Sequence, residues 1–109
     1  MTVSEIAQKL SLKTIVSSDE EREVNGVYIG DLLSWVMGRA KADDAWITIM
    51  SNINIVAVAA LVDTACIILA EDTVVDDDVK AVAEEKGVNI LSTEKTAYEV
   101  AVGLSELLK

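Results

Sequence analysis

Short polar side chains that follow the apolar segments of this sequence are the residues best suited to bind a ligand. Hydroxyl and amide groups both donate and accept hydrogen bonds, so they suit the recognition of a polar small molecule. Residues 51–54 separate two apolar runs, and residues 92 and 93 follow a third run. The candidate ligand-binding residues are Ser51, Asn52, Asn54, Ser92 and Thr93.

The side chains that carry most enzyme chemistry are scarce. The chain has no histidine, which removes the commonest general base and a common metal ligand. It contains no GxxxxGK[ST] phosphate loop, and GVYIG at residues 26–30 is not a dinucleotide-binding fingerprint. Because no nucleophile is paired with a base, we expect a protein that is not an enzyme.

The single cysteine and the acidic runs offer no stronger chemistry. Cys66 lies in the apolar run 65–70, so we expect a buried, unreactive thiol, and one cysteine allows no internal disulfide. The acidic segment 71–78 lacks the glycine and the terminal glutamate of a calcium loop. We expect it to be a solvated helix start, with no metal site, and the residues name no cofactor.

Length, composition and charge narrow the class of protein. The 109 residues suit one domain, expected over 1–109, and 51% of them are hydrophobic, enough for a core. Nine basic and nineteen acidic residues give a net charge of −10, which disfavours nucleic acid as a partner. Residues 1–10 do not resemble a signal peptide, and polar residues interrupt the apolar region 53–70. We therefore expect a cytoplasmic protein with no membrane partner.

The hydrophobic pattern predicts five strands and five helices. The predicted strands are residues 12–17, 24–31, 45–50, 65–70 and 88–92. The predicted helices are residues 3–10, 32–40, 53–62, 76–87 and 93–109. From residue 46 onward strands and helices alternate, which is typical of an α/β fold with a mainly parallel sheet flanked by helices.

Local signals refine the helix ends. Thr2 and Glu5 have the spacing of a capping box at the first helix. Asp31 is expected to cap the second helix. Asp76 is expected to cap the fourth helix and to form an ion pair with Lys80.

The two tryptophans have different expected roles. Trp46 begins a central strand and is expected in the core. Leu32, Trp35 and Met37 are expected to point largely inward from the second helix. If that helix lies at an edge of the sheet, its apolar face would instead suit a symmetric dimer.

The expected fold indicates where the polar candidates would act. Ligands of open α/β sheets bind outside the carboxyl ends of the strands, where loops 50–54, 70–73 and 91–96 would converge. Capping of the following helix is the alternative role for each Ser, Asn and Thr there. Glu71 and Asp72 disfavour phosphate at this edge unless a metal ion or Lys95 intervenes.

Residues 21–93 resemble the DRTGG domain, which is similar to the N-terminal domain of HPr kinase/phosphorylase. The strongest likeness lies in REVNGVYIGD, WITIMSNINIVAVA and ILST followed by AYE. The resemblance implies an α/β domain, usually dimeric, with a regulatory or ligand-sensing role. Such domains occur alone or fused to CBS domains and phosphotransacetylase, and small stand-alone members are encoded beside iron-hydrogenase-type redox proteins.

Two loops depart from the family pattern. Ser51-Asn52-Ile53-Asn54 stands where the family typically has a turn resembling Gly-Asp-Arg-Thr/Ser-Asp, and Ala70-Glu71-Asp72 stands where it often has Thr-Gly-Gly. The arginine is absent and acids are gained, which disfavours an anionic ligand. The phosphate loop of the kinase half of HPr kinase is absent.

Two functions follow. The first is a non-catalytic regulatory or small-molecule-sensing domain, working as a homodimer, with a nucleotide or metabolite bound at the carboxyl edge of the sheet. The alternative is a protein-interaction or scaffold module without a small-molecule ligand. That module would dock its acidic surface or its Trp35 face on a partner enzyme, such as a hydrogenase-type redox protein.

Overall fold

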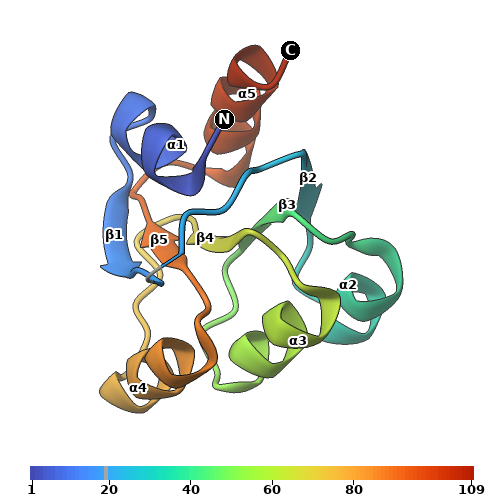
Figure 1. The fold of residues 1–109 in the computed structure, drawn as a ribbon, viewed down its shortest axis with the longest axis vertical. Helices are drawn as coiled ribbons and strands as arrows, with labels where there is room; N and C mark the ends of the chain where they lie inside the picture. Colours follow the sequence, from blue (N-terminus) through green and yellow to red (C-terminus); the bar gives the residue numbers. More distant parts are fainter. Residues whose placement is uncertain (19) are drawn as a thin grey trace.

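The computed structural model describes residues 1–18 and 20–109, which form one sheet between two layers of helices (Figure 1). The strands are β1 (Lys13–Val16), β2 (Gly26–Ile29), β3 (Asp44–Thr48), β4 (Cys66–Leu69) and β5 (Ile90–Ser92). The helices are α1 (Val3–Lys9), α2 (Leu33–Arg39), α3 (Asn54–Val62), α4 (Asp77–Lys86) and α5 (Ala97–Leu107). The expected α/β class and the order of elements are confirmed.

The sheet has the order β1-β5-β4-β3-β2. Strands β2 to β5 run parallel, and β1 pairs antiparallel with β5, with an irregular register between Thr14 and Val16. Every residue of β3 and β4 is buried, because helices cover both faces of these central strands. That double cover explains why their sequences are apolar throughout rather than alternating.

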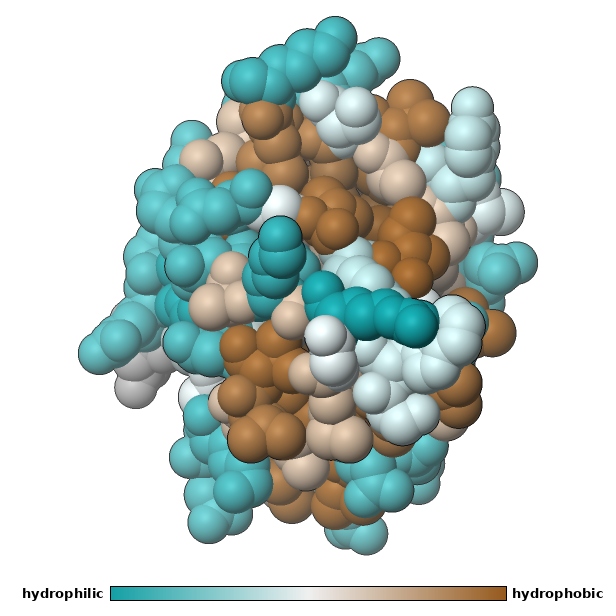
Figure 2. Space-filling view, turned by 90° about the vertical axis from the view of Figure 1, so that its right-hand side faces the viewer, coloured by the Kyte–Doolittle hydropathy of each residue, from teal (hydrophilic) through white to brown (hydrophobic). Residues whose placement is uncertain are grey.

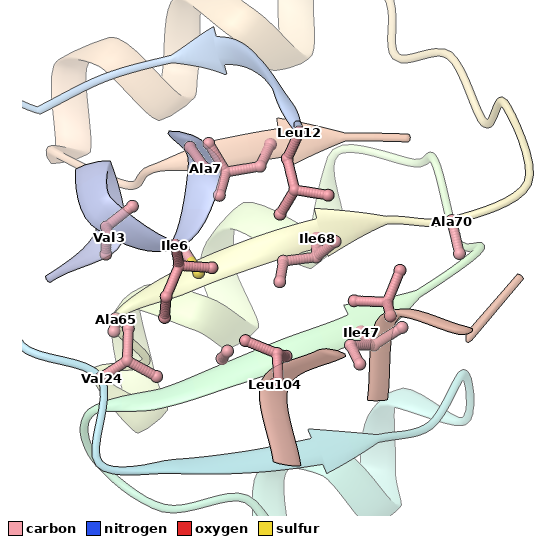
Figure 3. Close-up of a cluster of buried hydrophobic side chains, with 14 residues drawn as sticks. Val3, Ile6, Ala7, Leu12, Val24, Ile47, Ala65, Ile68, Ala70 and Leu104 are labelled. Atoms are coloured by element: carbon pink, nitrogen blue, oxygen red, sulfur yellow. The ribbon is translucent and has the colours of Figure 1, made fainter. Parts of the chain in front are cut away.

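Two separate cores lie on the two faces of the sheet. Helices α1 and α5 cover one face, where Ile6 and Leu104 pack with Ile47 and Ile68 (Figure 3). Helices α2, α3 and α4 cover the other face, around the fully buried Trp46. The expected core position of Trp46 is confirmed.

The connections explain this division of the helices. From β2 to β5 each strand lies beside the previous one, and right-handed crossovers in one direction put α2, α3 and α4 on one face. After β5 the chain passes to the opposite face to form α5. The segments that leave β4 and β5 therefore diverge at the carboxyl edge of the sheet.

Some helix ends follow the local sequence signals and others do not. Thr2 and Glu5 form the expected capping box of α1, and Gly87 ends α4 with φ +68°. Asp76 is the N-cap of α4, but its side chain makes no capping hydrogen bond. Lys80 lies 3.8 Å from Asp77, not beside Asp76, so the expected ion pair was wrong. The backbone of Asp76 is extended, so the helical i,i+4 spacing does not apply to it.

The prediction that Asp31 caps the second helix was wrong. Helix α2 has Leu32 as its N-cap, with no capping hydrogen bond from a side chain. Asp31 Oδ1 instead accepts hydrogen bonds from Thr48 Oγ1 at 2.8 Å and from the Ile49 N–H at 2.9 Å. Asp31 therefore ties the end of β2 to the end of β3.

The inward orientation expected for the second helix was also wrong. Leu32, Trp35 and Met37 are 58%, 55% and 46% exposed, and within α2 Val36 is fully buried. Helix α2 lies at the β2 end of the sheet, so it has a neighbour on one side only. The conditional prediction of an exposed apolar face holds.

Two further expectations concern the thiol and the membrane. Cys66 is fully buried, as predicted, and this burial raises the pKa of its thiol to about 12. Among the helices of the described residues, none has the length and apolar character to cross a membrane. Asp19, in the acidic segment 18–23, lies outside the described residues.

Candidate functional site

A crevice opens at the carboxyl ends of β4 and β5, where the chain leaves the two strands toward opposite faces. Such divergence leaves space between two loops, and it is the usual ligand position in open α/β sheets. Two adjoining hollows lie there and share Lys13, Asp72 and Ser92. Because β1 runs antiparallel to β5, its first residue, Lys13, reaches this same edge beside Ser92.

The first hollow, called here the apolar hollow, has a volume of about 220 Å³. Ile15, Leu69, Val74 and Val75 contribute its apolar wall. Its complete lining is Lys13, Ile15, Leu69, Asp72, Thr73, Val74, Val75, Lys80 and Ser92.

The second hollow, called here the polar hollow, has a volume of about 320 Å³. Its wall consists of side chains with hydroxyl, ammonium or carboxylate groups, from the α1–β1 turn, the β4–α4 loop and the β5–α5 loop. These residues are Ser11, Lys13, Asp72, Ser92, Thr93, Glu94 and Lys95.

Backbone hydrogen bonds tie the two diverging loops together beneath the crevice. The Asp72 N–H donates to the Thr93 carbonyl at 3.0 Å, and the Glu71 N–H donates to the Lys95 carbonyl at 2.9 Å. Glu71 and Asp72 have φ of +57° and +59°, a left-handed conformation that costs a residue with a side chain about 1 kcal/mol. Strained backbone of this kind is concentrated at ligand-binding sites.

The cationic side chains of the crevice differ in how far they are already engaged. Lys95 Nζ donates to the Leu10 carbonyl at 3.0 Å, and Lys80 Nζ lies at the longer distance of 3.8 Å from Asp77. Lys13 has no ion-pair partner in residues 1–18 and 20–109. Lys13 therefore has the ammonium group that is freest to meet a ligand.

Two of the predicted site residues lie in the crevice. Ser92 is half-buried, lines both hollows, and its hydroxyl makes no side-chain hydrogen bond within the described part of the chain. Thr93 is buried, and its Oγ1 accepts a hydrogen bond from the Lys95 N–H at 3.1 Å. Ser92 is thus free for a ligand, whereas Thr93 also holds the loop in shape.

The other three predicted site residues lie on a different loop. Ser51, Asn52 and Asn54 are exposed at the start of α3, and none of them lines either hollow. Asn52 Oδ1 accepts a hydrogen bond from the Asn54 N–H at 2.9 Å, which stabilises the turn into the helix. The loops after β3 and β4 lead to helices on the same face, unlike the loops after β4 and β5.

Sequence reasoning missed Lys13, Ile15 and Lys80 as residues of the crevice. Lys13 and Ile15 belong to β1, whose antiparallel place beside β5 leaves no local signal in the sequence. Lys80 was noticed only as a possible ion-pair partner on α4. Its position one turn into a helix that follows a polar loop could have suggested it.

A larger groove of about 700 Å³ lies at the opposite, amino edge of the sheet. Arg22 lines this groove, and its guanidinium group donates to Asp43 at 2.7 Å and to Asp63 at 3.0 Å, so it is already engaged. The hydrogen bond to Asp43 is the main cause of the raised pKa of Arg22. The other charged residues of its wall are Glu20, Glu84, Glu85 and Lys86, so its lining carries one net negative charge, which disfavours an anion.

The described residues bring together no group of three or more side chains able to hold a metal ion. The acidic segment 71–78 instead leads into α4, with Asp77 and Asp78 in its first turn. Acids at the N-terminal end of a helix are stabilised by the helix dipole, which gives these residues a structural role.

Comparison with protein families identifies the fold. The model of the DRTGG domain matches residues 5–107. The chain belongs to the DRTGG domain family. The resemblance seen in the sequence is thereby confirmed, whereas a search of curated proteins finds no match.

A solved structure shares the DRTGG fold of this chain. It contains the CBS and DRTGG domains of the regulatory region of Clostridium perfringens pyrophosphatase, complexed with the activator diadenosine tetraphosphate. The TM-score is 0.69 at 11% identity, so the likeness concerns the fold. The match covers 93% of this chain but 44% of that one, which also has CBS domains.

Proposed function

We propose that this DRTGG domain is a non-catalytic regulatory module that senses a small molecule bound in the crevice between β4 and β5. The observation that carries the proposal is the divergence of the two loops over adjoining hollows. The hollows share Lys13 and Ser92, whose side chains have no ion-pair or hydrogen-bond partner among residues 1–18 and 20–109. The regulatory setting of the pyrophosphatase relative supports a role in control rather than in chemistry.

The side chains of the crevice support binding rather than catalysis. Its hydroxyl groups have no histidine beside them, because the chain contains none. The Thr73 hydroxyl donates to the Ala70 carbonyl, and the Thr93 hydroxyl accepts from a backbone N–H, so both stabilise the loops. Such groups recognise a ligand without an activated nucleophile.

The ligand would contact Ser92 and Thr93 directly. Ser51, Asn52 and Asn54 follow β3, two strand positions away from β5. Neighbouring strands are about 5 Å apart, so a ligand would have to extend about 10 Å across the end of β4 to reach them. A nucleotide or a metabolite of comparable length meets that requirement.

We further propose that the domain works as a homodimer through the apolar surface at the β2 end of the sheet. The exposed side chains of this surface are Val27, Ile29, Leu32, Trp35 and Met37. Figure 2 shows this side of the molecule, where brown hydrophobic side chains lie among teal hydrophilic ones. β2 is the last strand of the sheet, and its outer edge has no partner strand in the described residues.

The same surface supports the alternative function. Exposed apolar side chains on a chain of net charge −10 suit docking on a partner enzyme as well as on a second copy. A hydrogenase-type redox protein remains the proposed partner for that alternative. The two functions differ in whether the crevice binds a small molecule.

Thermal unfolding with a panel of nucleotides and metabolites tests the sensing function. A ligand that binds only the folded state at 100 times its Kd adds about 2.7 kcal/mol of stability. For a domain of this size, that gain raises Tm by about 10 °C or more. Ser92→Leu is expected to abolish the response, whereas Asn52→Leu reduces it only when the ligand crosses β4.

Two outcomes contradict the sensing function. One is a panel in which no compound raises Tm while a purified partner enzyme binds the domain tightly. The other is a ligand response that survives Ser92→Leu at full strength, since the ligand would then lie elsewhere.

A further inference from the structure

The two hollows differ in the chemistry of their walls, and together they describe one kind of ligand. The apolar hollow offers aliphatic side chains from β1, β4 and the β4–α4 loop. The polar hollow offers ammonium and hydroxyl groups. Because they share Lys13, Asp72 and Ser92, one molecule can occupy both. Their volumes of about 220 and 320 Å³ lie, once joined, within the usual range for small-molecule sites.

The charge of the crevice is opposite in sign to that of the chain. Across the two hollows together, three lysines (Lys13, Lys80 and Lys95) and two acids (Asp72 and Glu94) give the lining one net positive charge. The polar hollow alone is neutral, because Lys80 lines only the apolar hollow. The whole chain carries −10, yet three of its nine basic residues line this crevice. An anion at the junction of the hollows, beside Lys13, is therefore attracted by the local charge.

The acids that disfavoured phosphate in the sequence are only partly present in the crevice. Glu71 is exposed and lines neither hollow, so of the pair Glu71 and Asp72 only Asp72 remains. Lys13 and Lys80 come from β1 and α4, outside that loop, and offset its charge. The balance at the site thus favours an anion although the loop sequence alone does not.

Building on the proposed sensing function, we propose that the crevice binds an organic phosphate of mononucleotide size. Its ring lies in the apolar hollow against Ile15, Val74 and Val75. Its phosphate lies where the two hollows meet, because Lys13 and the Ser92 hydroxyl, which donate to it, line both hollows. Lys95 is held beside the phosphate by its hydrogen bond to the Leu10 carbonyl.

Calorimetric titration with the four ribonucleoside monophosphates, their nucleosides and inorganic phosphate tests this assignment. At least one monophosphate is expected to bind more tightly than both its nucleoside and inorganic phosphate. Lys13→Ala is expected to weaken monophosphate binding about tenfold, the usual effect of one charge-assisted contact, and to leave nucleoside binding unchanged. Raising the salt concentration should weaken the monophosphate alone.

Matched variants separate the two halves of the site. Val74 is 79% exposed, so the uncharged variant Val74→Asn can fold, and it is expected to weaken nucleoside and monophosphate alike. Lys86→Ala, a lysine at the amino edge, should change neither. The inference is overturned if Lys13→Ala and Lys86→Ala behave alike, or if no monophosphate binds.

The failure of this inference is distinct from the failure of the sensing function. Binding of an uncharged metabolite that Ser92→Leu abolishes would retain the sensing function and overturn the phosphate assignment. Binding of inorganic phosphate as tightly as any monophosphate would overturn the role of the apolar hollow. No response to any compound would overturn both.

Discussion

The two ends of the sheet carry different kinds of side chain, although the outer strand at each end has four residues. At the β1 end, Lys13 begins the outer strand, and the register against β5 is irregular. At the other end, the outer strand β2 reads Gly-Val-Tyr-Ile and carries no charge. Lysines and bulges protect a sheet edge from further pairing, whereas an uncharged edge invites it.

The carboxyl loops show the same contrast. At the β1 end, the loops after β4 and β5 diverge and leave two hollows with strained backbone at Glu71 and Asp72. At the β2 end, the segments after β2 and β3 are tied together by Asp31, and the turn after β3 is stabilised by Asn52. One end thus carries the two hollows proposed to admit a small molecule, and the other carries the exposed apolar side chains proposed for docking. The following predictions test that division.

Removal of Asp31 is expected to have the largest effect on stability. Asp31→Ala deletes two hydrogen bonds to a carboxylate and leaves the Thr48 hydroxyl without its acceptor. We expect a loss of about 3 kcal/mol of unfolding free energy in urea titration. Glu94→Ala, at an exposed position of the crevice, is the control and should cost less than about 0.5 kcal/mol. Equal losses would show that Asp31 is not a tether.

Substitution of Trp35 is expected to disrupt the dimer and spare the crevice. Trp35 is 55% exposed with the Arg39 guanidinium 3.5 Å from the centre of its ring, so Trp35→Glu should leave the monomer folded. Removal of a tryptophan buried in an interface costs about 2 kcal/mol of binding free energy, so the dimer dissociation constant should rise roughly 30-fold. Sedimentation velocity measures this change. Val74→Asp should leave sedimentation unchanged. Wild-type protein that sediments as a monomer at every concentration would contradict the homodimer.

Relief of the strained loop is expected to stabilise the protein. Glu71→Gly removes the left-handed strain at φ +57° and should raise the free energy of unfolding by up to about 1 kcal/mol. Glu84→Gly, within the regular helix α4, is the matched control and should lower it by about 1 kcal/mol. The same sign for both variants would mean that the loop is not strained.

The thiol of β4 lies between the two ends and is expected to show the smallest effect. Burial raises the pKa of Cys66 to about 12 from an ordinary 9.0, so folding favours the neutral thiol. The contribution of the thiol to the free energy of unfolding is fully present below pH 9 and is lost as the pH rises from 9 toward 12. Native protein should not react with a thiol reagent at pH 8, and Cys66→Ala should flatten the decline above pH 9. Rapid labelling of the folded protein would contradict this burial.

The correct sequence predictions concern residues that act on near neighbours or are buried on both sides. The Thr2–Glu5 capping box spans three positions, and Gly87 ends α4 through its own backbone angle. Such contacts depend on a few consecutive residues, so local sequence specifies them. The uniformly apolar strands likewise predicted a sheet with helices on both faces.

The wrong predictions concern side chains whose partners lie far away along the chain. Asp31 has the type and place of a helix cap, but Thr48 and Ile49 compete successfully for its carboxylate. Trp35 and Met37 have the composition of a core, but the position of α2 beside the last strand leaves them exposed. No local sequence pattern indicates which strand lies at the edge of the sheet.

The sequence alone determined the α/β class, most helix ends, the buried cysteine and the polar residues at the carboxyl edge. Only the tertiary structure decided which of those polar residues share a crevice. The antiparallel pairing of β1 with β5 brings Lys13 to Ser92, and the change of face after β5 opens the space between them. Pairing and choice of face depend on how whole elements pack, which is a property of the assembled sheet rather than of any short segment.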